Sequence, residues 1–492
     1  MVQAVPSFEA YFERRPAPAR VGVVCLGHHL YWPQFAGLRE ELLGNYEDFL
    51  AGVRACEVEL VDAGLCDDPL SGAAAADALV RADVDLVIAY LATYTPSAHL
   101  QPIAQRTGRP VVLAALQAEA ALDYARATTY SQLVNDSIVS LPEICCALRR
   151  TRLEPADAIV GQLRDDPRAW GRLRQWCDIA RVLHVLRRGR LGLMGHVYEG
   201  MLDMTSDPTM VTGQLGPHVA HLELDDLAAE VEAVDEAAVD RQLALVREIF
   251  EFPQPGSDPI AGLVDEGELR WAVRVSVGLE RLVANHQLAG LAYYHRGRPG
   301  TPQERLGSSL TIGCSLLTGR GVPIAGELDL KNCVAMLILD RLGAGGSFAE
   351  IHPIDFPGNF VLVGHDGPHH MAIAAGRPVL RGLTVLHGKA GRGPGVEFAI
   401  RHGAVTIAGL TETADGGYRL VVAEGESLPG PIPATGNTNT RVRFGPDIAD
   451  FLERWSLAGP THHFALGVGH QADTLARLAH VLGIECVVVQ RA

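Results

Sequence analysis

Residues 21–31 read VGVVCLGHHLY, a short valine-rich run that ends in a glycine and two histidines. Such a run, bounded by a turn, is typical of a buried strand in a parallel α/β sheet. The turn lacks the G-x-G-x-x-G pattern that holds a pyrophosphate, so a dinucleotide cofactor is not expected. A ligand at the carboxyl end of this strand could meet His28, His29 and Tyr31, although His29 could instead cap or pack against the following helix.

The segments after this strand continue the alternation of strands and helices. Further strands are predicted at 58–61, 84–90 and 110–115, and helices at 35–53 and 73–80. This pattern indicates an open parallel sheet, so residues 1–150 are predicted to form a Rossmann-like α/β domain.

Two more domains complete the predicted organisation. Residues 151–357 are expected to form a second doubly wound α/β domain, with strands at 191–194 and 288–294 and a helix at 266–285. Residues 358–492 carry short strands, expected at 360–364, 379–386, 396–401, 404–410 and 418–423. The predicted fold is two doubly wound α/β domains followed by a C-terminal antiparallel β-rich, barrel-like domain.

Composition narrows the class of partner. The 492 residues include 58 acidic and 42 Lys or Arg residues, a net charge of −16, and no basic cluster interrupts this balance. A nucleic-acid or anionic-membrane partner is therefore not expected, and small neutral molecules fit better. Nine scattered cysteines without a Cys-x-x-Cys pair favour reduced thiols. With no apolar run near the roughly 18 residues of a spanning helix, a cytoplasmic protein is predicted.

Four side chains stand out as candidate metal ligands: Glu327, Glu350, His365 and His463. Each lies beside a glycine or in a loop-like stretch at the end of an apolar run. They are far apart in the sequence, so only a folded domain could gather them. Two carboxylates and two imidazoles suit a divalent ion with open positions, Mn²⁺ first and Co²⁺ or Mg²⁺ as alternatives.

Each candidate also has a purely structural explanation. Glu327 precedes a predicted helix at 328–342 and could simply complement the helix dipole. Glu350 could be an ordinary loop acid after a glycine-rich turn. His365 and His463 could be core histidines at the ends of strands.

The settings of the four residues resemble the motifs of the L-arabinose isomerase family. Residues 326–331 (GELDLK) are similar to the family's E-G-D-x-K, and 345–350 (GGSFAE) to its G-G-T-S-F-x-E. Residues 358–365 (GNFVLVGH) resemble its G-N-D-x-V-L-G strand, and 459–463 (GPTHH) its G-A-H-H. Near the start, 27–31 (GHHLY) matches G-S-Q-H-L-Y, and 94–96 (YTP) stands where the family has F-S-P.

This resemblance implies an activity and a site. It implies a three-part architecture and a homo-hexamer built from trimers, whose active sites are shared between subunits. It implies that Glu327, Glu350, His365 and His463 bind one ion, with His462 as the alternative to His463. Both glutamates would also relay the proton of an aldose–ketose isomerisation, and the residues implied to contact the sugar are His28, His29, Tyr31 and Lys331.

The chain departs from the family pattern around the substrate. Leu328 replaces the glycine after the first glutamate, Ser347 follows Gly346 without the family's threonine, and His28 replaces a glutamine. These changes predict a neutral sugar other than L-arabinose. Phosphorylated sugars are disfavoured because no P-loop is present and Lys331 is the only lysine near the motifs.

Two other classes of function fit the same residues. One is another metal-dependent enzyme on a sugar or sugar acid, such as an epimerase or lyase, which would use the same acid, base and metal. The other is a non-catalytic sugar-binding protein of the same fold. Such a protein would be expected to have lost one of the glutamates, and both are present.

Overall fold

The computed structural model describes residues 5–489 and divides the chain into two compact units. One unit is Pro16–His184. The other combines the N-terminal segment up to Arg15 with the chain from Val185 onward. Within the described residues, no helix is both long and apolar enough to cross a membrane.

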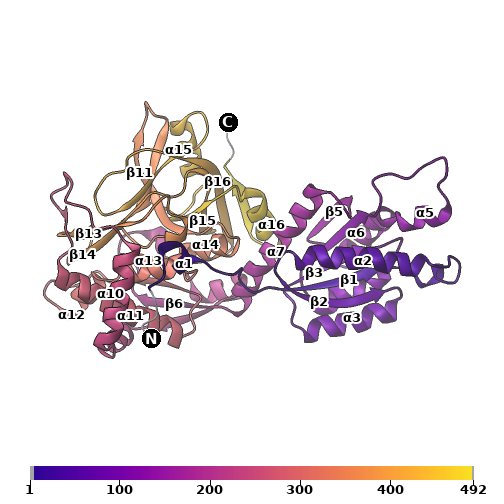
Figure 1. The fold of residues 1–492 in the computed structure, drawn as a ribbon, viewed down its shortest axis with the longest axis horizontal. Coiled ribbons are helices and arrows are strands. Elements are labelled where there is room, and N and C mark those ends of the chain that lie inside the picture. Colours follow the sequence, from indigo (N-terminus) through magenta and orange to yellow (C-terminus); the bar gives the residue numbers. More distant parts are fainter. Residues whose placement is uncertain (1–4, 490–492) are drawn as a thin grey trace. The chain divides into compact units, whose positions relative to one another are not determined.

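The unit Pro16–His184 is built on a five-stranded parallel sheet in the order β2-β1-β3-β4-β5 (Figure 1). This is one of the doubly wound strand orders, and its direction of winding reverses between β1 and β3. The strands are β1 (Arg20–Leu26), β2 (Glu59–Cys66), β3 (Leu86–Leu91), β4 (Val111–Gln117) and β5 (Asp157–Gln162).

Helices cover both faces of this sheet, which explains why its central strands are continuous apolar runs. One face packs against α3 (Pro69–Arg81), α4 (Gln101–Thr107) and α6 (Ser140–Arg150). On the other face, Phe49 of α2 (Leu38–Arg54) stacks on Tyr90 of β3 with ring centroids 4.6 Å apart. Because β5 adds a fifth strand, this unit extends to His184, beyond the boundary at residue 150 expected from the sequence.

The second unit contains another parallel sheet, in the order β10-β9-β6-β7. Its winding also reverses in the middle, between β6 and β9. The strands are β6 (Arg190–Gly195), β7 (His218–Leu222), β9 (Gly290–Tyr294) and β10 (Ile324–Ala325). The helices around it include α9 (Leu224–Glu232), α11 (Glu266–Asn285), α13 (Thr311–Gly319) and α14 (Leu330–Arg341).

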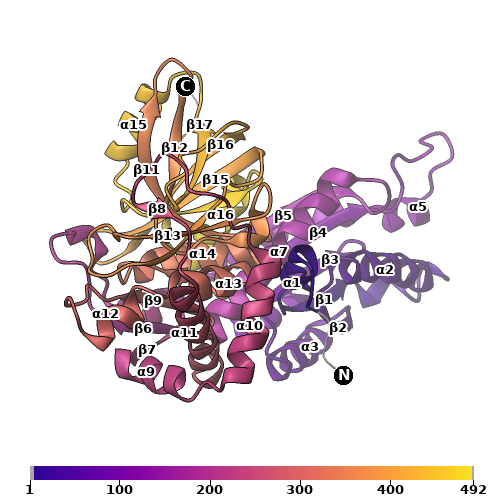
Figure 2. The same ribbon diagram turned by 60° about the vertical axis from the view of Figure 1, so that its left-hand side comes forward.

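The C-terminal part of this unit is a closed antiparallel barrel (Figure 2). Closure follows from β15, which pairs with β18 on one side and with β16 on the other. The sheet contains β11 (Ser347–Asp355), β12 (Phe360–His365), β15 (Gly403–Glu412), β16 (Tyr418–Leu428), β17 (Thr438–Arg443) and β18 (Phe464–Val468), with β19 (Glu485–Val488) parallel to β16. The predicted fold class is confirmed, although β11 already belongs to the barrel, before the boundary expected at residue 358.

Smaller elements complete this unit. A three-stranded sheet joins β8 (Ala261–Gly262), β13 (Val379–Leu383) and β14 (Gly393–Glu397). The helices α15 (Ile448–Leu457) and α16 (Ala472–Leu482) follow the later barrel strands. At the N-terminus, α1 (Phe8–Phe12) leads to Arg14, whose Nη2 donates to Oδ1 of the buried Asp340 over 2.6 Å.

Candidate active site

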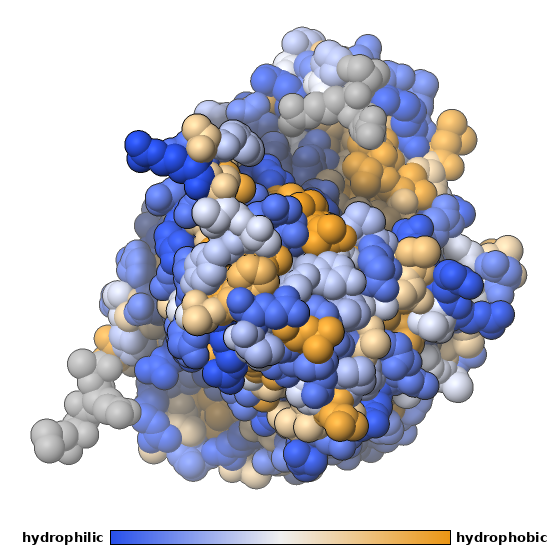
Figure 3. Space-filling model, turned by 90° about the vertical axis from the view of Figure 1, so that its right-hand side faces the viewer, coloured by the Kyte–Doolittle hydropathy of each residue, from blue (hydrophilic) through white to orange (hydrophobic). Residues whose placement is uncertain are grey.

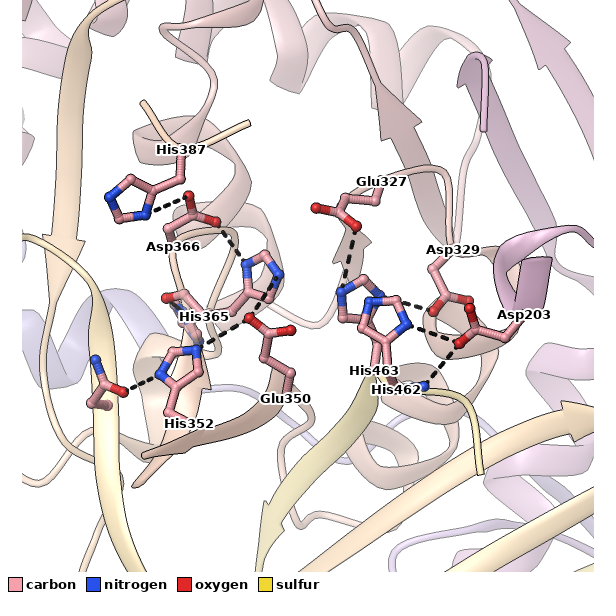
Figure 4. Close-up of polar contacts among 12 residues, drawn as sticks. Asp203, Glu327, Asp329, Glu350, His352, His365, Asp366, His387, His462 and His463 are labelled. Carbon is pink, nitrogen blue, oxygen red and sulfur yellow. Dashed lines mark hydrogen bonds and ion pairs between the residues drawn. The ribbon is translucent and has the colours of Figure 1, made fainter. Parts of the chain in front are cut away.

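The four predicted ligands come together in the second unit. Glu327 follows β10 at the carboxyl edge of the parallel sheet, while Glu350 lies on β11, His365 ends β12 and His463 immediately precedes β18. Nε2 of His463 lies 3.6 Å from Oε2 of Glu327, and Nε2 of His365 lies 3.8 Å from Oε1 of Glu350. Figure 4 shows the two carboxylates and the two imidazoles facing a common space.

The loop that carries Glu327 has an unusual backbone. Glu327 and Leu328 have φ angles of +54° and +62°, in the left-handed region that side chains other than glycine rarely adopt. Each such residue costs about 1–2 kcal/mol, and strain of this kind is concentrated at functional sites. Leu328 does not line the cavity beside Glu327 and Glu350, so its replacement of glycine affects the loop and not this space directly.

Glu327, Glu350, His365 and His463 form the cluster at the centre of the site. Nδ1 of each of its two histidines lies against the carboxylate of an aspartate. Nδ1 of His463 lies 3.2 Å from Oδ2 of Asp329, and Nδ1 of His365 lies 2.9 Å from Oδ1 of Asp366. A carboxylate in this position fixes the tautomer and orientation of a metal-binding histidine. The arrangement therefore leaves Nε2 of both rings directed at the shared space.

Glu350 is held by a neighbour on its own strand. Nε2 of His352 lies 3.2 Å from Oε1 of Glu350, and Nδ1 of His352 lies 2.6 Å from Oδ1 of Asn439. Residues two apart on a strand point to the same face, which brings the two side chains together. His352 thus orients the carboxylate from the barrel side.

The cluster opens into a cavity of about 470 Å³, which lies in the usual range for small-molecule sites. Glu327, Glu350 and His365 line it, together with polar side chains such as Asn437 and Asn439. Behind the cluster, the buried ring of Phe348 packs 4.7 Å from the ring of His365 and 4.4 Å from that of His463. One side of the cluster is therefore dry and the other is open to a ligand.

Burial and neighbouring charges move the titration of these groups in different directions. Burial raises the pKa of Glu327 and lowers the pKa of His463 to about 4. Burial also acts on His365, but the carboxylate of Asp366, 2.9 Å from Nδ1, outweighs it and raises the pKa of His365. In Glu350, the bond to His352 and the nearby imidazoles outweigh burial and lower the pKa. His463 is thus neutral at pH 7, the form that binds a metal.

The residues fit a divalent cation. Two groups of three side chains each place their ligand atoms within 4.8 Å of one another: Glu350, His365 and His463, and Glu327, His462 and His463. Oε2 of Glu327 and Nε2 of His463 are buried, and within residues 5–489 neither has a hydrogen-bond partner. Buried polar atoms are normally satisfied, so these two atoms point to an ion at the space they face.

Lys331 lies elsewhere. Its ammonium is buried and donates to the carbonyl of Thr205 over 2.8 Å and to Oγ of Ser206 over 3.0 Å. Lys331 is not among the residues that line the cavity. The structure therefore shows this lysine bound to the 205–206 loop, and the direct sugar contact expected from the sequence stays a prediction.

His28, His29 and Tyr31 belong to the unit Pro16–His184, where they follow β1 at the switch point of the sheet. The ring of His28 lies 5.0 Å from that of Tyr31 and 5.7 Å from that of Tyr94, which follows β3. Nδ1 of His28 is buried and has no partner in the described chain. Nδ1 of His29 is bonded to the carbonyl of Asp67 over 2.9 Å. In doubly wound sheets, ligands bind beyond the carboxyl ends of the strands at such a switch point.

Several residues of the site were not singled out from the sequence. The signals for three of them were local: His352 stands two positions from Glu350 on one strand face, Asp366 follows His365, and Asp329 stands two positions after Glu327. Asp203, which holds His462, gives no such signal, because the two residues are far apart in the chain.

Comparisons with known proteins agree with this geometry. Residues 345–485 match the L-arabinose isomerase C-terminal domain. An L-arabinose isomerase from Aeromonas salmonicida is 25% identical over 351 residues, 69% of this chain and 68% of that protein. A sulfoquinovose isomerase from Priestia megaterium is 25% identical over 318 residues, 64% of this chain and 67% of that protein. An L-arabinose isomerase from Nocardioides sp. is 26% identical over 429 residues, 82% of this chain and 80% of that protein.

The fold, the clustered acids and histidines and these matches define an enzyme of the sugar isomerase class. Within that class, the chain is most similar in its C-terminal part, residues 345–485, to the L-arabinose isomerase family, and it has diverged from the relatives named above to about 25% identity.

Proposed function

We propose that this enzyme is a metal-dependent aldose–ketose isomerase that acts through an enediol intermediate. The observation that carries the proposal is the convergence of Glu327, Glu350, His365 and His463 on one space beside a 470 Å³ cavity. Their mixed oxygen and nitrogen atoms favour Mn²⁺, with Co²⁺ or Mg²⁺ as alternatives. When bound, the cation supplies positive charge beside the sugar oxygens on which negative charge develops.

The chain's own side chains move the proton. Isomerisation transfers a proton between neighbouring carbons, which requires a base to remove it and an acid to return it. Glu327 and Glu350 stand on either side of the shared space and serve as that pair. Besides burial, the charge of Glu350 raises the pKa of Glu327, so the two carboxylates titrate together and the macroscopic pKa values belong to the pair. Asp329, Asp366 and His352 hold the histidines and Glu350 in place.

The proposed substrate is a neutral sugar other than L-arabinose. The relatives named above are L-arabinose and sulfoquinovose isomerases, so proteins similar to this chain differ in their sugars. An epimerase or lyase acting on a related sugar would use the same acid–base pair, and product analysis separates these reactions. Retention of both glutamates favours an enzyme over a non-catalytic binding protein.

The proposed assembly is a homo-oligomer, a hexamer by family resemblance. In it, His28, His29 and Tyr31 of one subunit, the His28 cluster, complete the active site of a neighbouring subunit. Figure 3 shows one face of the molecule, on which hydrophobic residues form small groups among hydrophilic ones. Exposed large apolar side chains of the unit Pro16–His184 include Leu30, Tyr124, Ile138 and Val139. These exposed side chains support contacts with further copies of the chain.

The proposed location is the cytoplasm. All nine cysteines are free thiols, in keeping with a cytoplasmic enzyme.

Metal-stripped protein, reloaded with Mn²⁺ and incubated with a panel of aldoses in D₂O, tests the proposal. NMR of the products should show a ketose that carries deuterium at the carbon to which the proton returns, since an enediol exchanges with solvent. Inversion of a stereocentre without ketose would identify an epimerase, and an unsaturated product would identify a lyase. Full activity of the stripped protein would refute metal dependence.

A further inference from the structure

His462 is tied to Asp203 by two hydrogen bonds to the same oxygen. The backbone N–H of His462 donates to Oδ2 of Asp203 over 3.0 Å, and Nδ1 of the ring lies 2.8 Å from that oxygen. A carboxylate only accepts hydrogen bonds, so Nδ1 carries the proton. In the tautomer that this contact selects, Nε2 carries the lone pair, and Asp203 sets the direction of the ring.

Nε2 of His462 has no partner of its own. It is buried, and no hydrogen-bonding group of residues 5–489 reaches it. His462 nevertheless lines the cavity of about 470 Å³, and a ring nitrogen of this residue lies within 4.8 Å of ligand atoms of Glu327 and His463. An acceptor left unsatisfied at the edge of a ligand cavity is a position for a donor brought by the ligand.

His463 is the better metal ligand of the adjacent pair. It belongs to both groups of converging ligand atoms, whereas His462 is absent from the group formed by Glu350, His365 and His463. The side chain of His463 is fully buried, and that of His462 is 33% exposed. The centroids of the two rings lie 3.8 Å apart, with the ring planes tilted by 42°. An ion held by Glu350, His365 and His463 would therefore leave His462 beside it, on the cavity side.

We propose that His462 is a substrate-binding residue whose Nε2 accepts a hydrogen bond from a hydroxyl of the sugar, and that Asp203 is its positioning residue. This inference rests on the proposed function, because it takes the ligand to be a polyhydroxylated sugar at the cluster. The consequence is selectivity. A sugar whose hydroxyl points elsewhere would leave Nε2 buried and unpaired. A site built to hydrogen-bond a hydroxyl strongly rejects sugars that cannot make that bond.

The test compares His462→Leu, which removes the acceptor at similar bulk, with His462→Gln, which keeps an acceptor at similar reach. Metal content per chain is measured first. Binding of sugar alcohols to the Mn²⁺-loaded protein is then measured by calorimetry, with xylitol, arabitol and galactitol as probes that bind without turnover. His463→Leu serves as the control for loss of a ligand.

We expect His462→Leu to keep its metal while its Kd for the best sugar alcohol, and its KM for the best aldose, rise about 5- to 100-fold, the range for an unpaired buried acceptor. His462→Gln should recover part of this loss. Asp203→Ala should weaken binding in the same direction with the histidine still present, and it replaces the first variant if His462→Leu does not fold.

Two results would overturn the inference. Metal loss in His462→Leu as complete as in His463→Leu would make His462 a ligand, and unchanged Kd and KM would remove it from the substrate. A third result would overturn the proposed function itself. In that case the wild-type protein would bind no sugar alcohol and isomerise no aldose.

Discussion

Asp329 caps helix α14 with one carboxylate oxygen and holds His463 with the other. Oδ1 accepts a hydrogen bond from the backbone N–H of Asn332 over 2.9 Å, and Oδ2 lies 3.2 Å from Nδ1 of His463. One buried side chain thus links the start of a helix to a histidine 134 residues away in the sequence.

Asp329→Ala should weaken metal binding by about 10- to 100-fold, because the orientation of His463 is lost. The missing cap should also lower the free energy of unfolding by about 1 kcal/mol. Calorimetric metal titration and denaturation in EDTA measure the two effects separately. Asp447→Ala is the matched control, since Asp447 caps α15 on the surface and is remote from the cavity lining. Asp447→Ala should lower the free energy of unfolding without changing the metal affinity. Equal metal affinity in both variants would contradict the role given to Asp329.

Glu327→Gln and Glu350→Gln should each retain the fold and lower turnover by about 10²- to 10⁴-fold, the usual contribution of an acid or base. Activity must be measured together with metal content, because both residues also face the ion. Near wild-type turnover in a fully metallated variant of either residue would exclude it from proton transfer.

L-arabinose should be a poor substrate. His28 stands where the family has a glutamine, which replaces an amide by a ring of different reach, and unpaired buried polar groups discriminate strongly between sugars. A screen of pentoses, hexoses and deoxy sugars with Mn²⁺ should find a better substrate, with phosphorylated sugars disfavoured. Conversion of L-arabinose with kcat/KM of about 10⁴ M⁻¹s⁻¹ or more, the range of ordinary enzymes, would contradict this expectation.

Asp340→Asn should lower the free energy of unfolding at pH 7 by about 3–5 kcal/mol, the effect of breaking a buried ion pair. The Asp340 side chain is 1% exposed and contacts Arg14, Arg341 and His370, the last over 2.8 Å. The bond and charge of His370 and the two arginines outweigh burial and hold the pKa of Asp340 well below its usual range.

The pH dependence of this effect has a defined sign. An unfolded aspartate titrates near 3.9, so the stabilisation is complete above about pH 4 and is lost as the pH falls toward the folded-state pKa. Urea denaturation at pH 7 and near pH 3 should therefore show a smaller difference between wild type and variant in acid. Asp450→Asn, which removes a surface pair with Arg454, should change stability by less than about 1 kcal/mol. If the stability difference between wild type and Asp340→Asn were larger near pH 3 than at pH 7, ionised Asp340 would not be the source of the stabilisation.

Sharing of sites between subunits can be tested by mixing two inactive variants. If the cluster at His28 completes a neighbour's site, Glu350→Gln chains assembled with a His28→Ala, Tyr31→Ala double variant should recover part of the activity, since some sites then contain both intact halves. Light scattering gives the size of the assembly. An active monomer, or no recovery in confirmed mixed oligomers, would exclude a shared site.

The sequence by itself determined many of the strands and helices and marked the four residues at the centre of the site. The apolar runs of β1, β3 and β12 mark buried strands because side-chain periodicity is a local property. Glu327, Glu350, His365 and His463 were recognisable because each keeps a characteristic local setting.

Tertiary structure alone decided how distant segments pair. Closure of the barrel depends on β15 meeting both β16 and β18, and the pairing of Asp203 with His462 joins residues 259 apart. The position of Lys331 shows the same limit. Helix α14 places its ammonium against Thr205 and Ser206, a pairing across more than 120 residues that the motif around Lys331 does not indicate. Periodicity fixes which face a residue occupies, whereas what covers that face depends on long-range packing.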